Sequence, residues 1–499
     1  MSMATARLIC RAPWHKLPSS RRGLLTAARS YDEALAKLAA LPSNRSTTGL
    51  FSDSSTADEL NGRALPEMNS WLLNAGYSPD DLSRIRTIHV AGTKGKGSVC
   101  AFATAMLLRS GMVKGRVGTY TSPHLATPRE RIALDGEPLA RQEFADAVFE
   151  LDERLAASTS DRPFFFRFMT LLAWHVFLSR AVSDAVIECG IGGEYDATNV
   201  LPASALSATV ITQLDMDHVA MLGGSLETIA WHKAGIMKSG VRCFARHHRD
   251  ASVSAVLRAR AAERGVPALL ELDDGVLRKW HGVSGGQLSG GFQKANQALA
   301  AMAVREHLEL SCAGEDTVEA LSSLSPELVQ GLREARLRGR CEVLERRGVT
   351  WLLDGAHTRQ SLAAVAAWLA TLIEGTQQQV ILVFNQQERE PGPLLEALVT
   401  AVAHETGRQD VFRTALFTPN HGRECAPTDE LDTSVQRKAA AAMEALLPDC
   451  ETSALDNVDD AVMRVEHLAR CRGGTKVLVT GSLHLVGTML RALDPDMLS

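Results

Sequence analysis

The sequence predicts an α/β protein built from two domains. Short apolar runs of strand length alternate with longer segments whose apolar residues recur at helical spacing, which is typical of parallel sheets covered by helices. A glycine-rich turn at 89–98 lies between one apolar run and one helical pattern, and the chain of 499 residues is too long for one ordinary core. We therefore expect a larger N-terminal domain at 31–338 and a smaller C-terminal domain at 339–499.

Composition is typical of a globular protein of enzyme size without a strong net charge. Hydrophobic residues make up 45% and charged residues 22% of the chain, and the formal net charge is −5. This balance supplies no basic field for nucleic acid, and no apolar run reaches the roughly 18 residues of a membrane span. The nine cysteines include no Cys-x-x-Cys pair, which argues against a zinc site or a disulfide framework and favours a reducing compartment.

Residues 1–30 differ from the rest of the chain. They are basic and rich in serine, and no acidic residue precedes Asp32. This composition is typical of a mitochondrial transit peptide, and a disordered basic tail is the alternative. We expect this segment to lie outside the fold, and the protein to be mitochondrial, in the matrix or associated with the inner membrane, with a cytoplasmic form as well.

The elements of the N-terminal domain follow from two kinds of pattern. Helical spacing predicts helices over 31–41, 65–75, 99–109, 141–156 and 165–178, and apolar runs predict strands over 85–91, 116–120, 185–188 and 208–212. Residues 43–63 are rich in Ser, Thr, Gly, Asp and Asn, which predicts a mobile loop or insertion. Because each strand ends in polar residues, we expect a mainly parallel sheet with helices on both faces and a ligand site at its carboxyl edge.

A smaller, Rossmann-like α/β domain is predicted after a link at 333–341. Its strand candidates are 350–353, 380–384, 415–417 and 476–480, separated by helical patterns such as 362–372. We expect this sheet to be mainly parallel too.

The glycine-rich turn makes the N-terminal domain P-loop-type and is predicted to hold phosphate. Backbone N–H groups of such a turn, with the N-terminus of the next helix, present positive charge to a polyphosphate. The usual pattern ends in Gly-Lys-Ser/Thr, whereas here Lys96 precedes Gly97 and Ser98. An ordinary strand-to-helix turn is the alternative. The residues assigned to the phosphates are Gly92, Thr93, Lys94, Gly95, Lys96, Gly97 and Ser98.

Four polar residues are predicted at strand ends or in the loops that follow: Ser122, Glu188, His218 and Lys233. A bound polyphosphate needs Mg²⁺, which prefers hard oxygen ligands, and the Ser122 hydroxyl and the Glu188 carboxylate meet that need. His218 is a candidate ligand of a second ion. Taken singly, each of the four also fits an ordinary structural role.

Further candidates lie where the domains are expected to meet. Asp354 and His357 follow the first strand of the second domain, and Arg340 lies at the link, where a guanidinium could hold a phosphate. Asn296 is placed at the start of a helix, where it could cap the helix or contact an adenine. A cleft between domains is a common place for a ligand.

Together these motifs resemble the Mur-ligase-like amide ligases, and within them the folylpolyglutamate synthases of eukaryotic, fungal type. The resemblance rests on ordered motifs at 89–98, 121–125, 129–132, 166–173, 188–199, 233–238, 353–358 and 477–487. The unusual end of the glycine turn is the form found in this family. Two features depart from the family pattern: Phe292 replaces a common histidine, and the segment 214–218 replaces Leu-Gly-Leu/Ile-Asp-His.

The resemblance implies a role for each candidate residue. The implied nucleotide contacts beyond the glycine turn are Asn296, Arg340, Asp354 and His357. The implied Mg²⁺ ligands, for one ion or two, are Ser122, Glu188 and His218. The implied catalytic residues are Lys96, Glu188, His218 and Lys233. The family can carry the lysine at position 233 as a carbamate, and a monovalent cation such as K⁺ can accompany Mg²⁺.

The activity implied is the ATP-dependent addition of L-glutamate in γ-linkage to tetrahydrofolate and its polyglutamates. ATP converts the terminal carboxylate to an acyl phosphate, which the amine of L-glutamate attacks. Domain closure is expected to keep water away from the acyl phosphate. A dihydrofolate synthase acting on dihydropteroate is the close alternative, and a nucleotide-binding module without ligase activity is the alternative of another class. We expect a monomer without a nucleic-acid partner or a membrane span.

Overall fold

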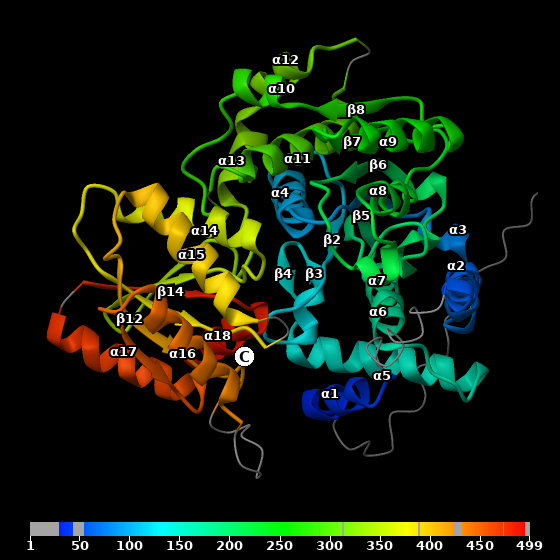
Figure 1. Cartoon of the computed structure of the whole chain (residues 1–499). Coiled ribbons are helices and arrows are strands. Elements are labelled where there is room, and N and C mark those ends of the chain that lie inside the picture. Colours follow the sequence, from blue (N-terminus) through cyan, green and yellow to red (C-terminus); the bar gives the residue numbers. More distant parts are fainter. Residues whose placement is uncertain are drawn as a thin grey trace, which may run out of the picture.

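The computed structural model describes residues 29–42, 54–288, 290–311, 314–387, 390–422, 432–472 and 474–494. These residues form two α/β domains, each with its own sheet (Figure 1). The predicted transit peptide lies, up to residue 28, outside the described residues. Among the described helices, none combines the length and the apolar character that crossing a bilayer requires.

The N-terminal sheet has eight strands in the order β4-β3-β2-β5-β1-β6-β7-β8. The strands are β1 (Arg86–Ala91), β2 (Arg116–Tyr120), β3 (Ile132–Leu134), β4 (Glu137–Pro138), β5 (Val182–Glu188), β6 (Leu206–Ile211), β7 (Cys243–Arg246) and β8 (Leu269–Leu272). Neighbouring strands in the part of the sheet ordered β2-β5-β1-β6-β7-β8 are parallel. The strand β3 is antiparallel to both β2 and β4. The mainly parallel sheet predicted for this domain is confirmed.

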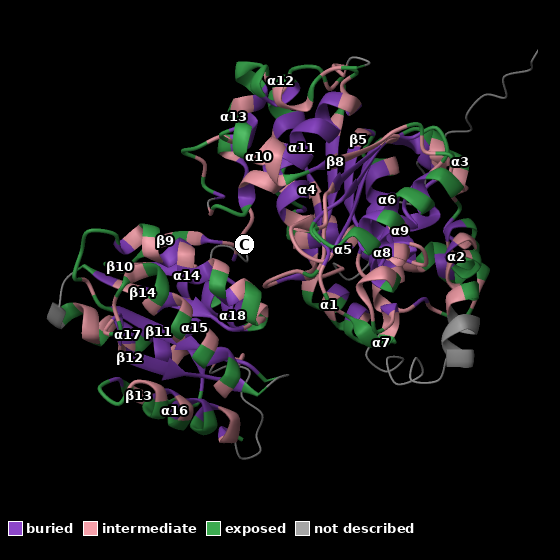
Figure 2. Ribbon diagram, turned by 45° about the horizontal axis from the view of Figure 1, so that its top comes forward, coloured by how far each residue is buried: buried purple, intermediate pink, exposed green. Residues whose placement is uncertain are grey.

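Helices cover both faces of this sheet (Figure 2). They are α1 (Tyr31–Ala39), α2 (Ser54–Asn74), α3 (Pro79–Leu82), α4 (Lys96–Arg109), α5 (Arg141–Ser158), α6 (Phe165–Ser179), α7 (Val219–Leu222), α8 (Leu226–Ala234), α9 (Ala251–Glu263), α10 (Asp274–Lys279), α11 (Gln293–His307), α12 (Thr317–Ser322) and α13 (Pro326–Glu334). Side chains alternate across a strand, so Ala185 and Ile187 of β5 join the core with α5 and α6, whereas Val186 joins the core with α4 and α11.

The loop predicted over 43–63 is wrong in its second part. Helix α2 begins at Ser54, eleven positions before the helix predicted at 65–75. Polar composition favoured a loop, but these residues continue the helix whose later turns bury Met68 and Leu72 in the core with α5 and α6. Residues 43–53 lie outside the described residues.

The C-terminal sheet has six strands in the order β13-β12-β11-β14-β10-β9. Its elements are β9 (Glu342–Arg346), β10 (Val349–Leu353), α14 (Arg359–Ile373), β11 (Val380–Phe384), α15 (Pro391–Thr406), β12 (Phe412–Phe417), α16 (Ser434–Leu446), β13 (Glu451–Ala454), α17 (Val458–Arg472), β14 (Thr475–Thr480) and α18 (Leu483–Leu493). The pairs are parallel except β9 with β10, so the mainly parallel prediction is confirmed. The sequence did not predict β9 and β13, because edge strands as exposed as these carry no apolar run.

Candidate active site

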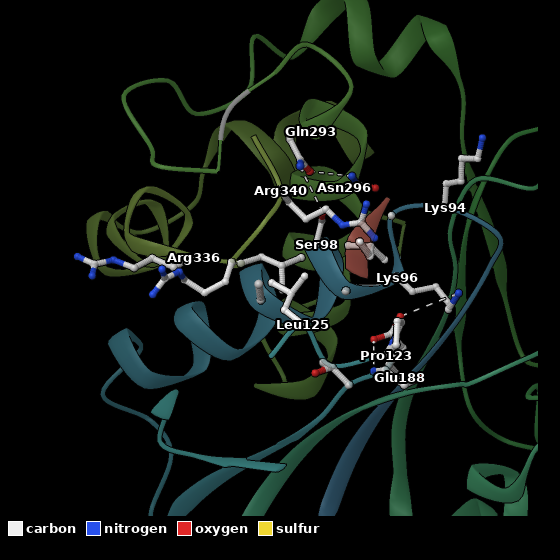
Figure 3. Close-up of a pocket in the computed structure, with 18 of the residues that line it drawn as sticks. Lys94, Lys96, Ser98, Pro123, Leu125, Glu188, Gln293, Asn296, Arg336 and Arg340 are labelled. Carbon is white, nitrogen blue, oxygen red and sulfur yellow. Dashed lines mark hydrogen bonds and ion pairs between the residues drawn. The ribbon is translucent and has the colours of Figure 1, made fainter. Parts of the chain in front are cut away.

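A cavity of about 1880 Å³ lies between the two domains, at the carboxyl edge of the N-terminal sheet (Figure 3). Its wall includes the glycine turn, the segment after β2, the end of β5, the start of α11 and the segment after β10. The predicted site residues in this wall are Thr93, Lys94, Gly95, Lys96, Gly97, Ser98, Ser122, Glu188, His218, Asn296, Arg340, Asp354 and His357. Gly92 and Lys233 contact each other outside the wall.

The glycine turn leads from β1 into α4, and two of its glycines are required by geometry. Gly92 has φ 145° and Gly95 has φ 89°, which favour glycine. A Cβ at Gly92 would lie 1.8 Å from Thr212 Oγ1, and one at Gly95 would lie 2.4 Å from Asn296 Oδ1. Gly95 is the N-cap of α4 and supplies no side-chain cap. The first N–H groups of α4 therefore remain suited to a phosphate.

Glu188 ends β5 and lies buried beside this turn. Its Oε2 accepts a hydrogen bond from the backbone N–H of Ser122 at 3.0 Å, and its Oε1 lies 4.0 Å from Lys96 Nζ (dashed lines in Figure 3). Burial raises the pKa of Glu188, and the nearby Lys96 and Arg340 oppose that rise. The carboxylate oxygens keep acceptor capacity, and together with the Ser122 hydroxyl they offer the hard donors that fit Mg²⁺.

His218 reaches the same cavity from the loop before α7. It has φ 49°, and its side chain is 48% exposed with Nε2 4.0 Å from Asp217 Oδ2. Partial burial lowers the pKa of His218, the nearby Asp217 carboxylate opposes that fall, and the positive charges of Lys96 and Lys233 add to it. A lowered pKa favours the neutral imidazole, which is the form that binds metals.

Lys233 lies in the last turn of α8 and is only 2% exposed. Its Nζ donates a hydrogen bond to the carbonyl oxygen of Gly92 at 2.9 Å. Burial first, and then repulsion from Lys96, lowers the pKa of Lys233 to about 7. A substantial fraction of this amine is therefore neutral near pH 7, which is the form that reacts with carbon dioxide.

The start of α11 packs against the glycine turn. The N-cap of α11 is Phe292, and Asn296 lies inside the helix, so the capping role predicted as one alternative for Asn296 is wrong. Asn296 Nδ2 instead donates to Gln293 Oε1 at 2.8 Å, and Gln293 Nε2 donates to Ser98 Oγ at 3.2 Å. Gln293 was not among the predicted site residues, although its position at the helix start, three residues before Asn296, was an available signal.

Asp354 lies on the C-terminal side of the cavity, directly after β10. Its Oδ2 accepts from the backbone N–H of Cys341 and its Oδ1 from that of Ala356, both at 2.9 Å. Burial raises the pKa of Asp354, and Arg340 opposes the rise. The two oxygens thus connect the backbone just before β9 with the backbone just after β10.

Comparison with known proteins assigns the chain to a family. Residues 338–492 match the family model described as dihydrofolate synthetase, C-terminal domain. The folylpolyglutamate synthase of Saccharomyces cerevisiae is 33% identical over 498 residues, which cover 94% of this chain and 88% of the yeast protein. The chain belongs to the folylpolyglutamate synthase family.

Solved folylpolyglutamate synthases share this fold. The enzyme of Thermotoga maritima superposes with a TM-score of 0.67 at 22% identity, over 93% of this chain and 96% of that one. The Mycobacterium tuberculosis enzyme complexed with ADP and AMPPCP gives a TM-score of 0.67 at 24% identity, over 86% and 95%. A bifunctional folylpolyglutamate synthase/dihydrofolate synthase of Yersinia pestis gives 0.65 at 24%, over 93% and 98%.

In this member of the folylpolyglutamate synthase family, the segment after β2 also touches the second domain. The Glu130 carboxylate accepts hydrogen bonds from the backbone N–H groups of residues 125–127 at 2.6–2.9 Å. Arg491 of α18 donates to the carbonyl of Ala126 at 3.2 Å, and a Cβ at Gly487 would lie 2.1 Å from the carbonyl oxygen of Leu125. The segment that carries Ser122 therefore also packs against α18. Glu130 is a further site residue that the sequence did not single out, although it lies within the motif at 129–132.

Proposed function

We propose that this chain catalyses the ATP-dependent glutamylation of folates, in γ-linkage and through an acyl phosphate. The observation that carries the proposal is the pairing of buried Glu188 with Lys96 of the glycine turn, inside a cavity between two domains. Family membership supports the ligase class. The Mycobacterium tuberculosis relative complexed with ADP and AMPPCP supports nucleotide binding.

Different residues of the cavity bind the phosphates, neutralise charge and hold the metal ion during phosphoryl transfer. The N–H groups of the glycine turn and of α4 bind the phosphates, and Lys96 offsets charge on the transferring phosphoryl group. The folate carboxylate attacks the γ-phosphorus and ADP leaves, and the amine of L-glutamate then attacks the acyl carbon and expels phosphate. Glu188 and Ser122 would hold Mg²⁺, with His218 as the candidate for a second ion. Bound there, Mg²⁺ supplies charge neutralisation at the phosphates.

A carbamate on Lys233 belongs to the same proposal. The buried amine, with its pKa of about 7, can attack carbon dioxide and release a proton, which leaves an anionic carbamate beside Gly92. The test is carbon-13 NMR of the protein in ¹³C-bicarbonate. A carbamate resonance that is present in the wild type and absent in Lys233→Met supports the modification, and two identical spectra contradict it.

A substrate-resolved assay tests the proposed activity. The purified protein is incubated with ATP, Mg²⁺, L-glutamate and either tetrahydrofolate or dihydropteroate, with and without K⁺, and the products are separated by mass. Extension of tetrahydrofolate is the expected result. The matched family model, described for dihydrofolate synthetase, favours dihydropteroate as the second candidate substrate, and a product from dihydropteroate alone would establish that activity instead. Nucleotide binding without either product would identify a non-catalytic module.

We also propose that residues 1–30 direct a form of the protein to mitochondria, and that the protein acts as a monomer. The basic, acid-poor composition of this segment supports the first point. Fusing residues 1–30 to a fluorescent protein should produce mitochondrial fluorescence, and diffuse fluorescence would contradict the proposal. Light scattering of the purified protein measures the oligomeric state.

A further inference from the structure

Two of the three side-chain contacts of Lys94 cross the boundary between the two domains. Its Nζ donates to Thr358 Oγ1 at 2.9 Å and to Gln360 Oε1 at 3.1 Å, and it lies 3.2 Å from Asp215 Oδ2. An ammonium group carries three protons, and these three acceptors are enough to bind all of them. Figure 3 shows the Lys94 side chain pointing away from Lys96, although one residue separates the two lysines in the same turn.

Each end of this contact is held by its own domain. On the N-terminal side, the Lys94 carbonyl accepts from Thr212 Oγ1 at 2.7 Å, and the Lys94 N–H donates to the carbonyl of Gln213 at 3.2 Å. On the C-terminal side, Thr358 is the N-cap of α14, and its Oγ1 accepts from the Ser361 N–H at 3.2 Å. Because both ends are tied to backbone, the contact forms only when the two domains stand in this arrangement.

His357 connects this contact to the site. It precedes Thr358 in the chain and lines the same cavity as Lys96. Its Nδ1 lies 2.9 Å from the carbonyl oxygen of Gly355, and since a carbonyl only accepts, Nδ1 carries a proton. The distance from His357 to the glycine turn is therefore set by the same segment that Lys94 holds.

We propose that Lys94 is an interdomain positioning residue, which holds the start of α14 against the glycine turn so that both domains face one nucleotide. This inference rests on the proposed function: it assigns one lysine of the turn to the domain arrangement and leaves Lys96 to the phosphates. Loss of the contact reduces the fraction of molecules in this arrangement of the domains, which slows turnover without removing the groups that bind ATP.

The kinetic test compares Lys94→Met, Gln360→Met and the double variant in the glutamylation assay. Lys94→Met is expected to lower kcat about tenfold, with the KM for ATP within about twofold of the wild type. The double variant is expected to be no slower than Lys94→Met, because both changes break one contact. Lys94→Arg, the matched control, keeps the charge and should recover most of the kcat. A tenfold rise in the KM for ATP with unchanged kcat, or additive losses in the double variant, would overturn the proposal.

Small-angle X-ray scattering with AMPPCP and Mg²⁺ tests the same inference without any turnover. The Lys94→Met protein is expected to show a larger radius of gyration than the wild type, and an unchanged radius would contradict the positioning role. If the wild type binds AMPPCP but glutamylates no folate, the proposed function fails, whereas the scattering comparison still decides the role of Lys94.

Discussion

Each domain places one buried carboxylate at the carboxyl edge of its sheet, and the two are held differently. Glu188 accepts one backbone N–H, from Ser122, and its other oxygen lies toward a lysine of the cavity. Asp354 accepts two backbone N–H groups, one on each oxygen. The first carboxylate keeps capacity for a ligand, whereas the second ties together the segments before β9 and after β10. The carboxylate that accepts fewer backbone N–H groups, Glu188, therefore has more lone pairs available to a ligand.

The largest expected effect is the loss of activity in Glu188→Gln. Bound Mg²⁺ contributes several kcal/mol to phosphoryl transfer, so removing its buried carboxylate ligand should lower the rate of glutamate incorporation roughly 10²- to 10³-fold. The free energy of unfolding should change little, because an amide oxygen can still accept from Ser122, and Lys96, which loses its nearby carboxylate, lines the cavity between the domains. Urea unfolding and the glutamylation assay measure the two effects. Wild-type activity in this variant would contradict the role of Glu188 as a ligand of Mg²⁺.

The N-terminal site also holds a buried lysine, whose effect on stability depends on pH. The pKa of Lys233 is about 7 in the folded protein, below its unfolded value of 10.5, so between these values the unfolded chain binds a proton that the folded protein has released. Stability relative to Lys233→Met should therefore rise from pH 7 to pH 10, by at most about 1.4 kcal/mol per pH unit. Unfolding curves of both proteins in buffer depleted of carbon dioxide measure this slope. A difference that does not change with pH would contradict the lowered pKa.

For Asp354→Asn we expect a loss of stability and a smaller loss of activity than in Glu188→Gln. Asparagine has one acceptor oxygen, so its NH₂ group would face one of the two backbone N–H groups that Asp354 now satisfies. Leaving such a buried donor unsatisfied costs about 1–3 kcal/mol of stability. The rate of glutamate incorporation should fall less than in Glu188→Gln, because the Asp354 carboxylate accepts hydrogen bonds from backbone N–H groups. If Asp354→Asn is as stable as the wild type but as inactive as Glu188→Gln, Asp354 acts on the ligand and the structural role given to it here is wrong.

The sequence predicted most of the central strands, because central parallel strands carry continuous apolar runs, but it did not predict the short buried strand β7. The strand expected at 85–91 is observed at Arg86–Ala91, and 380–384 is observed unchanged. The meeting of Ser122 and Glu188 also followed from the sequence, since neighbouring parallel strands end at the same edge. The exposed edge strand β9 and the polar start of α2 carry no such signal.

The directions of polar side chains could not be predicted from local patterns. Lys94 was grouped with the phosphate contacts because it lies in the glycine turn, yet its acceptors Thr358 and Gln360 are more than 260 positions away in the chain. Asn296 was placed correctly near a helix start, but whether it caps the helix depends on where the first turn begins. Such features depend on how the two domains pack, which no local spacing encodes.

The measurement that tests the central claim most directly is the Mg²⁺ dependence of AMPPCP binding, followed by calorimetry in the wild type, Glu188→Gln and Asp354→Asn. If Glu188 holds the ion at the phosphates, Mg²⁺ will strengthen binding at least about tenfold in the wild type and in Asp354→Asn, and will have little effect in Glu188→Gln. An equal Mg²⁺ dependence in Glu188→Gln and the wild type would contradict the assignment of the metal site to the end of β5.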